Sequence, residues 1–332
     1  MIRVGLLVVM VCASLWGQTK PGQAKNWTSP KTPWGDPDLQ GMWPGNMGVP
    51  LQRPESLGTR TTLTDEEFAQ KEAQAKKQAQ ADSQSTAASD SVGIGPPSYW
   101  VERGKPSRQT SLIIDPPNGR LPPLTEEEQK LRKEARGGKG FPGEWRGEAN
   151  SYEDLNIYYR CITRGLLGSI IPVVYNNGNE ILQAPGLVII RNEMIHESRV
   201  IPLDGRPHLN AAIRQYMGDS RGHWEGNTLV IETTNFTDKD AIGSNGAGYP
   251  GDPGHHSADL KLTERLTRVD ADTLNYQATI DDLKTWTKPW TILIPLKRND
   301  HYQLLEYACH EGNIAISDIL SGARADERKE TK

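Results

Sequence analysis

The feature that most restricts the fold of this chain is a series of short strand-like segments in its second half. From Tyr152 to Leu320 the sequence runs in short apolar-rich stretches that are separated by turn residues. No helical segment long enough for a crossover between parallel strands lies among them. Consecutive strands joined by short turns pair as antiparallel hairpins, so the sequence predicts a mainly β domain over residues 151–322.

Alternation within these segments predicts which way their side chains face. Leu260, Leu262 and Leu266 fall on one side of a strand whose other side is polar. Because so many strands must hide their edges, we expect an antiparallel lipocalin-like barrel, or else a sandwich. The clearest expected strands are Ile181 to Ile190, Met194 to Leu203, Thr228 to Thr234, Leu260 to Val269, Thr273 to Ile280, Trp290 to Leu296 and Tyr302 to Ala308.

Residues 18–150 have a different character and are expected to wrap the β domain. Up to about Leu63 they are rich in Pro, Gly and Trp, which excludes regular helix and indicates an extended strap. Two capping boxes then predict two charged helices, the first of them exposed and followed by a flexible linker. The boxes and the expected helix ends are Thr64 with Glu67 and about Gln80, and Thr125 with Glu128 and Arg136.

The first 17 residues have the layout of a secretory signal peptide. Arg3 is the positive start, an apolar stretch runs from Val4 to Trp16, and the small residue Gly17 precedes the polar Gln18. The stretch is too short to span a membrane, and no later segment is long and apolar enough. We therefore expect a secreted or periplasmic protein that begins close to Gln18, with lipidation at Cys12 as the less favoured alternative.

Charge and cysteine content narrow the partners and the redox compartment. A net charge of -4 and a pI near 6.0 argue against a nucleic-acid partner. Cys161 and Cys309 remain after the signal segment is removed, and an even number in an exported protein predicts a disulfide. Two unrelated buried thiols are the alternative. Residues 323–332 are expected to form a polar tail.

The aromatic composition indicates surfaces that are partly exposed to solvent. Nine Trp and ten Tyr against three Phe favour residues that combine an apolar ring with a polar group. Such residues occur in ligand clefts, and equally at the edges of ordinary sandwiches. The expected ligand-binding residues are Asp219, Arg221, Trp224, Tyr276, Trp286 and Trp290.

Two acidic residues interrupt apolar faces of the expected strands. Glu264 lies between Leu262 and Leu266, and Glu306 lies beside Leu304. An unpaired buried carboxylate is costly, so each is either in a salt bridge with a nearby Arg or held in a pocket for function. In the second case Glu264 and Glu306 are the candidate catalytic acid and base, a pair of the kind that cleaves glycosidic bonds.

Other motifs give little support to a specific chemistry. Gly218 to Gly222 match G-x-S-x-G, but a turn and a strand follow where the nucleophile elbow needs a helix. No His pair has chelating spacing, and His255 and His256 are expected at the surface of a Gly-rich loop. We therefore expect no metal site, and the absence of nucleotide and haem motifs predicts no cofactor.

Several strings resemble a widespread group of exported, uncharacterised bacterial proteins. They are WGDPDLQGMW, SLIIDPPNGRLPPLT, GDSRGHWEGNTLVIETTNFTDK and EYACHEGN, and the likeness covers nearly the whole mature chain. This resemblance implies export but no activity. The strand pattern from GHWEGNTLVIE onward is also similar in style to lipocalin-like barrels.

Three functions follow from these observations. The first is binding of a small apolar, amphipathic or sugar ligand in the mouth of the barrel. The second is an exported hydrolase or lyase that acts on carbohydrate or phenolic material through a pocket carboxylate. The third is an envelope interaction protein that docks through its Trp-rich N-terminal segment. A cavity favours the first two functions, whereas a filled core with exposed Trp favours the third.

Overall fold

A computed structural model describes most of the chain. The described residues are 27–45, 47–84, 97–136, 139–141, 144–147, 149–155, 157–239, 241–242 and 253–330. The expected signal segment lies outside them, as does most of the expected linker. None of the helices within these ranges has the length and apolar character that crossing a membrane requires.

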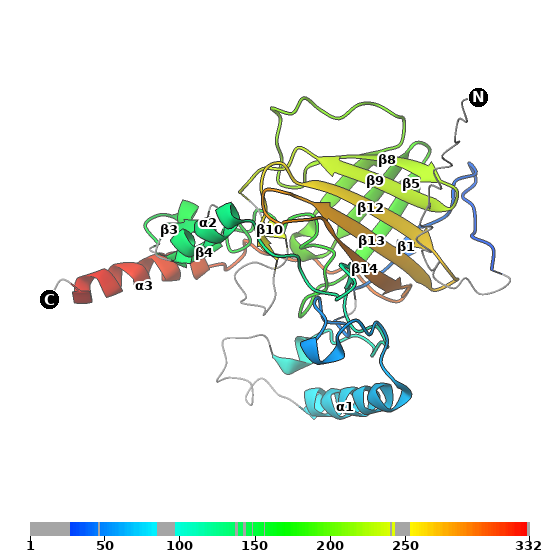
Figure 1. The fold of residues 1–332 in the computed structure, drawn as a ribbon, viewed down its shortest axis with the longest axis horizontal. Helices are drawn as coiled ribbons and strands as arrows, with labels where there is room; N and C mark the ends of the chain where they lie inside the picture. The colour runs from blue at the N-terminus through cyan, green and yellow to red at the C-terminus, as the bar shows by residue number, and fades with distance from the viewer. Residues whose placement is uncertain are drawn as a thin grey trace, which may run out of the picture.

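The larger of the two main sheets has six antiparallel strands in the order β2-β14-β13-β12-β9-β8 (Figure 1). The expected inward alternation is confirmed on β12, where Leu262 and Leu266 are buried. The strands are β2 (Ile113–Asp115), β8 (Asp219–Glu225), β9 (Thr228–Thr234), β12 (Lys261–Arg268), β13 (Thr273–Asp281) and β14 (Trp290–Lys297).

The smaller main sheet is also antiparallel and has the order β1-β5-β6-β7. The prediction of a single strand from Ile181 to Ile190 is wrong, because Pro185 and Gly186 form a two-residue turn that divides it into β5 and β6. Gly186 has φ 72°, a conformation that glycine adopts without steric cost. The strands are β1 (Gly41–Met42), β5 (Asn179–Ala184), β6 (Leu187–Asn192) and β7 (Ser198–Pro202).

Both sheets contribute to one hydrophobic core. Ile181 and Ile190 of the smaller sheet belong to the same buried cluster as Leu229 and Leu262 of the larger sheet. Trp43 from the N-terminal strap is fully buried in this cluster. Within the described residues the backbone ladders leave both sheets open, so the fold is mainly β with two antiparallel sheets around a shared core.

The expected helices are present at the edge of this body. α1 (Asp65–Gln84) begins at the predicted capping box, where the Thr64 amide donates to Glu67 Oε2 at 2.8 Å. None of its residues is buried, which confirms that the helix is exposed, and Figure 1 shows it lying below the large sheet. α2 (Glu126–Arg136) begins after Thr125, whose hydroxyl accepts from the Glu128 amide at 3.2 Å.

The C-terminal part differs from the expectation. Tyr302 to Ala308 form no strand, because the Leu305 amide donates to a Glu193 carboxylate and not to a ladder partner. Residues 323–330 of the expected polar tail belong to α3 (Ala315–Glu330), which extends away from the body (Figure 1). Only Ser198–Pro202 of the expected strand Met194 to Leu203 is a strand.

The remaining elements are short. The elements are β3 (Lys139–Phe141), β4 (Glu144–Gly147), β10 (Ala241–Ile242), β11 (Gly254–His255) and the 3-10 helices η1 (Glu55–Leu57), η2 (Ser98–Trp100), η3 (Tyr152–Asp154) and η4 (Met194–His196). Two of them, β3 and β4, pair with each other in antiparallel fashion within and just after residues 137–145, which the sequence suggested as loop.

Candidate functional site

Glu264, the leading candidate for chemistry, lies inside the core and is paired. Its carboxylate has no exposed surface. It accepts hydrogen bonds from both terminal nitrogens of Arg199 on β7, one of them at 2.8 Å. The Tyr276 hydroxyl donates to Glu264 Oε1 at 2.8 Å. Burial opposes the charged guanidinium, but the neighbouring carboxylate outweighs this effect and raises the pKa of Arg199. Of the two alternatives that the sequence left open for Glu264, a salt bridge and a pocket acid, the structure shows the salt bridge.

Glu306 does not join Glu264. It is exposed on the irregular segment that follows β14, so the prediction that it faces an apolar interior is wrong. Strand alternation does not apply there, because Tyr302 to Ala308 lack a ladder. The two carboxylates therefore do not form the expected acid and base pair.

The predicted aromatic ligand-binding residues belong mainly to the core. Tyr276, Trp286 and Trp290 are at most 1% exposed, and the two indole rings meet edge to face at 5.5 Å between centroids. Trp224 is partly buried against the same cluster. Rings without exposed surface cannot contact a ligand at the molecular surface, so the expectation that these residues line a mouth is not supported.

Asp219 and Arg221 form a local polar cluster at the start of β8. Arg221 donates to Asp219 Oδ1 at 2.7 Å, while His208 Nδ1 and the Leu209 amide contact Asp219 Oδ2 at 3.0 and 2.9 Å. Burial acts to raise the pKa of Asp219, but the hydrogen bonds from Leu209, His208 and Arg221 outweigh it, so the pKa is lowered. The cluster holds the loop before β8 against the sheet.

The predicted disulfide is confirmed. Cys161 and Cys309 are bonded, with their Cα atoms 5.7 Å apart. The bond joins the irregular segment before β5 to the segment after β14.

The histidine pair is buried, contrary to the prediction that both side chains lie at the surface. His255 is 8% exposed and His256 is 2% exposed. Arg132 of α2 donates to the carbonyl oxygens of Pro253 and His255, and Glu128 lies 3.4 Å from His255 Nδ1. The contact with α2, which is remote in sequence, covers the loop.

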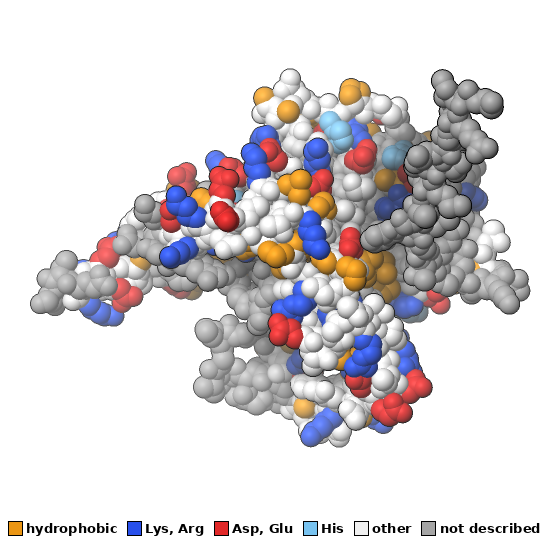
Figure 2. Space-filling view, viewed as in Figure 1, with side chains coloured by type: hydrophobic (Ala, Val, Ile, Leu, Met, Phe, Trp, Pro, Cys, Tyr) orange, Lys and Arg blue, Asp and Glu red, His pale blue; other side chains and the backbone are white. Residues whose placement is uncertain are grey.

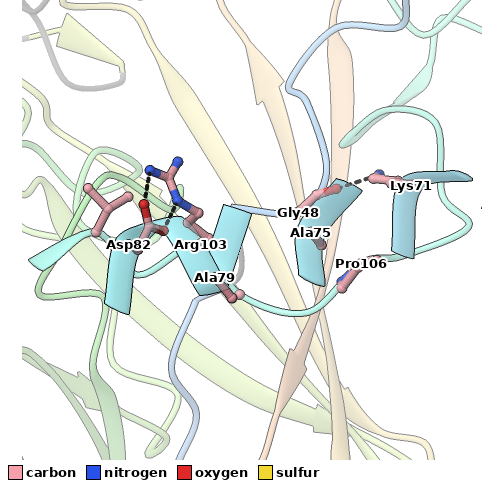
Figure 3. A pocket seen from close by; sticks show the side chains of 9 residues that line it. Gly48, Lys71, Ala75, Ala79, Asp82, Arg103 and Pro106 are labelled. Carbon is pink, nitrogen blue, oxygen red and sulfur yellow. Dashed lines mark hydrogen bonds and ion pairs between the residues drawn. The ribbon is translucent and has the colours of Figure 1, made fainter. Parts of the chain in front are cut away.

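A pocket that the sequence analysis did not anticipate lies between α1 and residues 101–106 (Figure 3). Its volume is about 380 Å³. The helix contributes residues at intervals of four, four and three, which place them on one face. The lining residues are Gly48, Lys71, Ala75, Ala79, Asp82, Val101, Arg103, Gly104 and Pro106.

One end of this pocket carries a lysine, Lys71, for which the described residues supply two hydrogen-bond acceptors. Lys71 Nζ donates to the carbonyl oxygens of Gly48 and Ser107 at 2.6 and 3.2 Å, which uses two of its three protons. Among the described residues no carboxylate lies within ion-pair distance of this ammonium group. Burial lowers the pKa of Lys71.

The other end of the pocket is closed by an ion pair. Arg103 donates to both oxygens of Asp82, at 2.5 and 3.1 Å. The hydrogen bond from Arg103 lowers the pKa of Asp82. Ala75 and Ala79 lie between this pair and Lys71 along the helix in Figure 3, so the pocket has an apolar wall between two polar ends.

The surface around α1 is otherwise strongly charged. Figure 2 shows acidic and basic side chains interspersed over this part of the molecule. The helical spacing of Lys71, Ala75, Ala79 and Asp82 is visible in the sequence. The segment that completes the pocket is not, because only the tertiary structure brings residues 101–106 to that face.

Comparisons of the chain with models of protein families, with curated proteins and with solved structures gave no match.

Proposed function

We propose that this protein binds a small amphipathic anion in the pocket between α1 and residues 101–106. The observation that carries the proposal is Lys71, a cation at the pocket wall whose partners are two carbonyl oxygens. A negatively charged group would accept a hydrogen bond from the third N–H of Lys71 and balance the charge of the ammonium group. Charge-assisted hydrogen bonds of this kind are roughly twice as strong as neutral ones.

The walls and the size of the pocket support an apolar stem on this anion. Ala75, Ala79, Val101 and Pro106 present methyl and ring groups with little side-chain bulk. The volume of about 380 Å³ lies within the range of about 300–1,000 Å³ that small-molecule sites occupy. From Lys71 to Asp82 the helix rises roughly 16 Å, at about 1.5 Å per residue, which limits the length of the stem.

A matched pair of lysine variants tests this site. Isothermal titration with straight-chain carboxylates of increasing length should show binding to the wild type that is strongest at one intermediate length. Lys71→Met should weaken that binding by about tenfold or more, about 1.4 kcal/mol. Lys77→Met, which removes an exposed lysine of the same helix outside the pocket, should leave it unchanged. Equal binding by both variants, or none by the wild type, would refute the proposal.

We also propose that the two sheets pack face to face as a sandwich. The support is that each sheet is open among the described strands and that inward residues of both meet in one cluster. The core position of Arg199 and Glu264 occupies the space that a lipocalin-like barrel would leave for a ligand. A ligand site outside the two sheets is consistent with this filled interior.

Export and docking through the strap also stay proposals, with unequal support. Disulfides persist in oxidising compartments, so the bond between Cys161 and Cys309 supports a location outside the cytoplasm. Docking through the Trp-rich strap has less support, because Trp43 is fully buried in the core and Trp34 is only 38% exposed.

A further inference from the structure

Three tyrosines with no role in the proposed ligand pocket meet near the disulfide. Tyr158 and Tyr175 lie on the irregular segment before β5, and Tyr307 lies on the segment after β14. All three are half-buried. Tyr158 precedes Cys161 and Tyr307 precedes Cys309 by a few residues, so the disulfide holds the segments of these two tyrosines together. The three rings pack against a buried apolar cluster of Val173, Met194 and Ile195.

The three hydroxyl groups form a triangle. Tyr158 Oη and Tyr307 Oη are 3.3 Å apart. The Tyr175 hydroxyl is in hydrogen-bond contact with both of the others. Three phenol hydroxyl groups thus interact with one another, although they come from positions up to 149 residues apart.

The surroundings hold this triangle in place. The Arg164 guanidinium stands over the face of the Tyr158 ring, 5.2 Å from its centroid, and its charge favours the ionised form of the Tyr175 hydroxyl. Ile195 and His196 both have left-handed backbone conformations, with φ of 57° and 43°. This conformation is costly for a β-branched residue, and such strain persists where the surrounding structure over-determines it, often at functional sites.

His196 contacts the segment that carries Tyr307. Its Nδ1 lies 3.2 Å from the carbonyl oxygen of Tyr307. Since a carbonyl oxygen only accepts, Nδ1 is the donor in this contact. Metal-binding histidines are held by the same type of contact, with one ring nitrogen donating to a carbonyl and the other left for the metal.

We propose that the hydroxyl triangle of Tyr158, Tyr175 and Tyr307 is a binding site for a hard trivalent cation, with ferric iron as the ion to test. Hard oxygen ligands suit hard cations, and tyrosine oxygen is an established ligand of iron. An octahedral ion with bonds of about 2.0–2.1 Å has oxygens about 2.9 Å apart on each face. The separation of 3.3 Å between the Tyr158 and Tyr307 oxygens is close to that edge length.

The charges and protons of this binding step balance without any redox change. Each phenol releases its proton to solvent as its oxygen binds the ion, and three phenolates neutralise three positive charges. The ion enters and stays in the ferric state, so no oxidant or reductant is required. Water would supply the other ligands.

Visible absorption gives a direct test. One equivalent of ferric nitrilotriacetate should produce a phenolate-to-iron charge-transfer band with the oxidised wild-type protein. Tyr307→Phe and Tyr175→Phe should each lower the apparent affinity by tenfold or more. Tyr159→Phe, which removes the neighbouring hydroxyl on the same segment, should retain the band. A thermal melt of each variant separates loss of the site from loss of the fold.

Several outcomes would overturn the site. These are the absence of a band in the wild type, a band that survives in both triangle variants, or an equal loss in Tyr159→Phe. Gallium, which has the same charge but no accessible redox change, should compete with iron for the site. A failure of gallium to compete would also count against a site built on charge and oxygen geometry.

Discussion

At the scale of single residues, the pairing of Glu264 with Arg199 changes what a substitution should do. Glu264→Gln would leave the Arg199 charge buried without its carboxylate, since both side chains are at most 6% exposed. Breaking such a pair costs about 3–5 kcal/mol. We therefore predict that Glu264→Gln lowers the free energy of unfolding by at least about 3 kcal/mol, as measured by denaturant titration.

A double variant is the matched control for this pair. Replacing both partners by apolar residues, Arg199→Met with Glu264→Leu, removes the charges together and should recover much of the lost stability. An unfolding free energy of Glu264→Gln equal to that of the wild type would instead mean that the acid is held for a purpose other than the ion pair.

The buried His256 predicts a pH dependence of stability. Burial lowers its pKa from 6.5 to about 4, while hydrogen bonding through Ser257 acts in the opposite direction. Between these two values the unfolded chain binds the proton and the folded chain does not, so stability rises with pH. The contribution of about 3 kcal/mol should be complete above the unfolded pKa and lost as the pH falls towards about 4.

His256→Asn isolates this effect, because it keeps a short donor for the Ser257 carbonyl oxygen and removes the titrating ring. Thermal unfolding from pH 7 to pH 4 should show a smaller decrease in the variant than in the wild type. Parallel pH profiles for the two proteins would assign the acid sensitivity to other groups.

At the scale of elements, α1 stands out because none of its residues is buried. Its links to residues 103–108 include the ion pairs of Asp82 with Arg103 and Asp65 with Arg108, the Lys71 ammonium, and the Arg108 guanidinium over the Phe68 ring at 4.4 Å. Surface ion pairs each contribute roughly 0–1 kcal/mol, so the helix should open separately from the sheets.

Native-state amide hydrogen exchange measures this directly. The amides of α1 should exchange with an opening free energy several kcal/mol below that of β12 and β13. A ligand of the adjacent pocket should slow exchange in α1 and leave the two strands unchanged. Protection of α1 equal to that of the sheet in the free protein would show that the helix belongs to the global folding unit.

At the scale of the whole molecule, the disulfide restricts the unfolded chain. It closes a loop with a sequence separation of 148 residues, for which the chain-entropy model predicts about 5 kcal/mol. Reduction should therefore lower the melting temperature of the wild type markedly. The double variant Cys161→Ser with Cys309→Ser should melt at the lower temperature whether or not reductant is present.

Two free thiols in the unfolded, unreduced protein would contradict the bond. The disulfide is also a control for the tyrosine triangle, because it joins the segments that carry Tyr158 and Tyr307. Without added reductant, which would reduce the ferric ion, the double variant Cys161→Ser with Cys309→Ser should bind ferric iron more weakly than the wild type.

Local pattern was sufficient for the elements whose bonding is local or regular. The alternation of β12 and the capping box of Thr64 and Glu67 could both be predicted from the sequence, because strand alternation and capping depend on residues a few positions apart. The same reasoning failed over Tyr302 to Ala308, where the Leu305 amide and the Tyr302 hydroxyl donate to Glu193 and no ladder forms.

The sequence by itself determined the antiparallel β class, the exposed charged helix and the identity of the bonded cysteines. Only the tertiary structure decided that Glu264 faces Arg199, that α1 and residues 101–106 enclose a pocket, and that three tyrosine hydroxyls meet. The reason is physical: periodicity specifies which face a side chain occupies, whereas its partner depends on how two sheets and their loops pack. Those contacts join residues that are 65 and 149 positions apart, and no local pattern encodes such a distance.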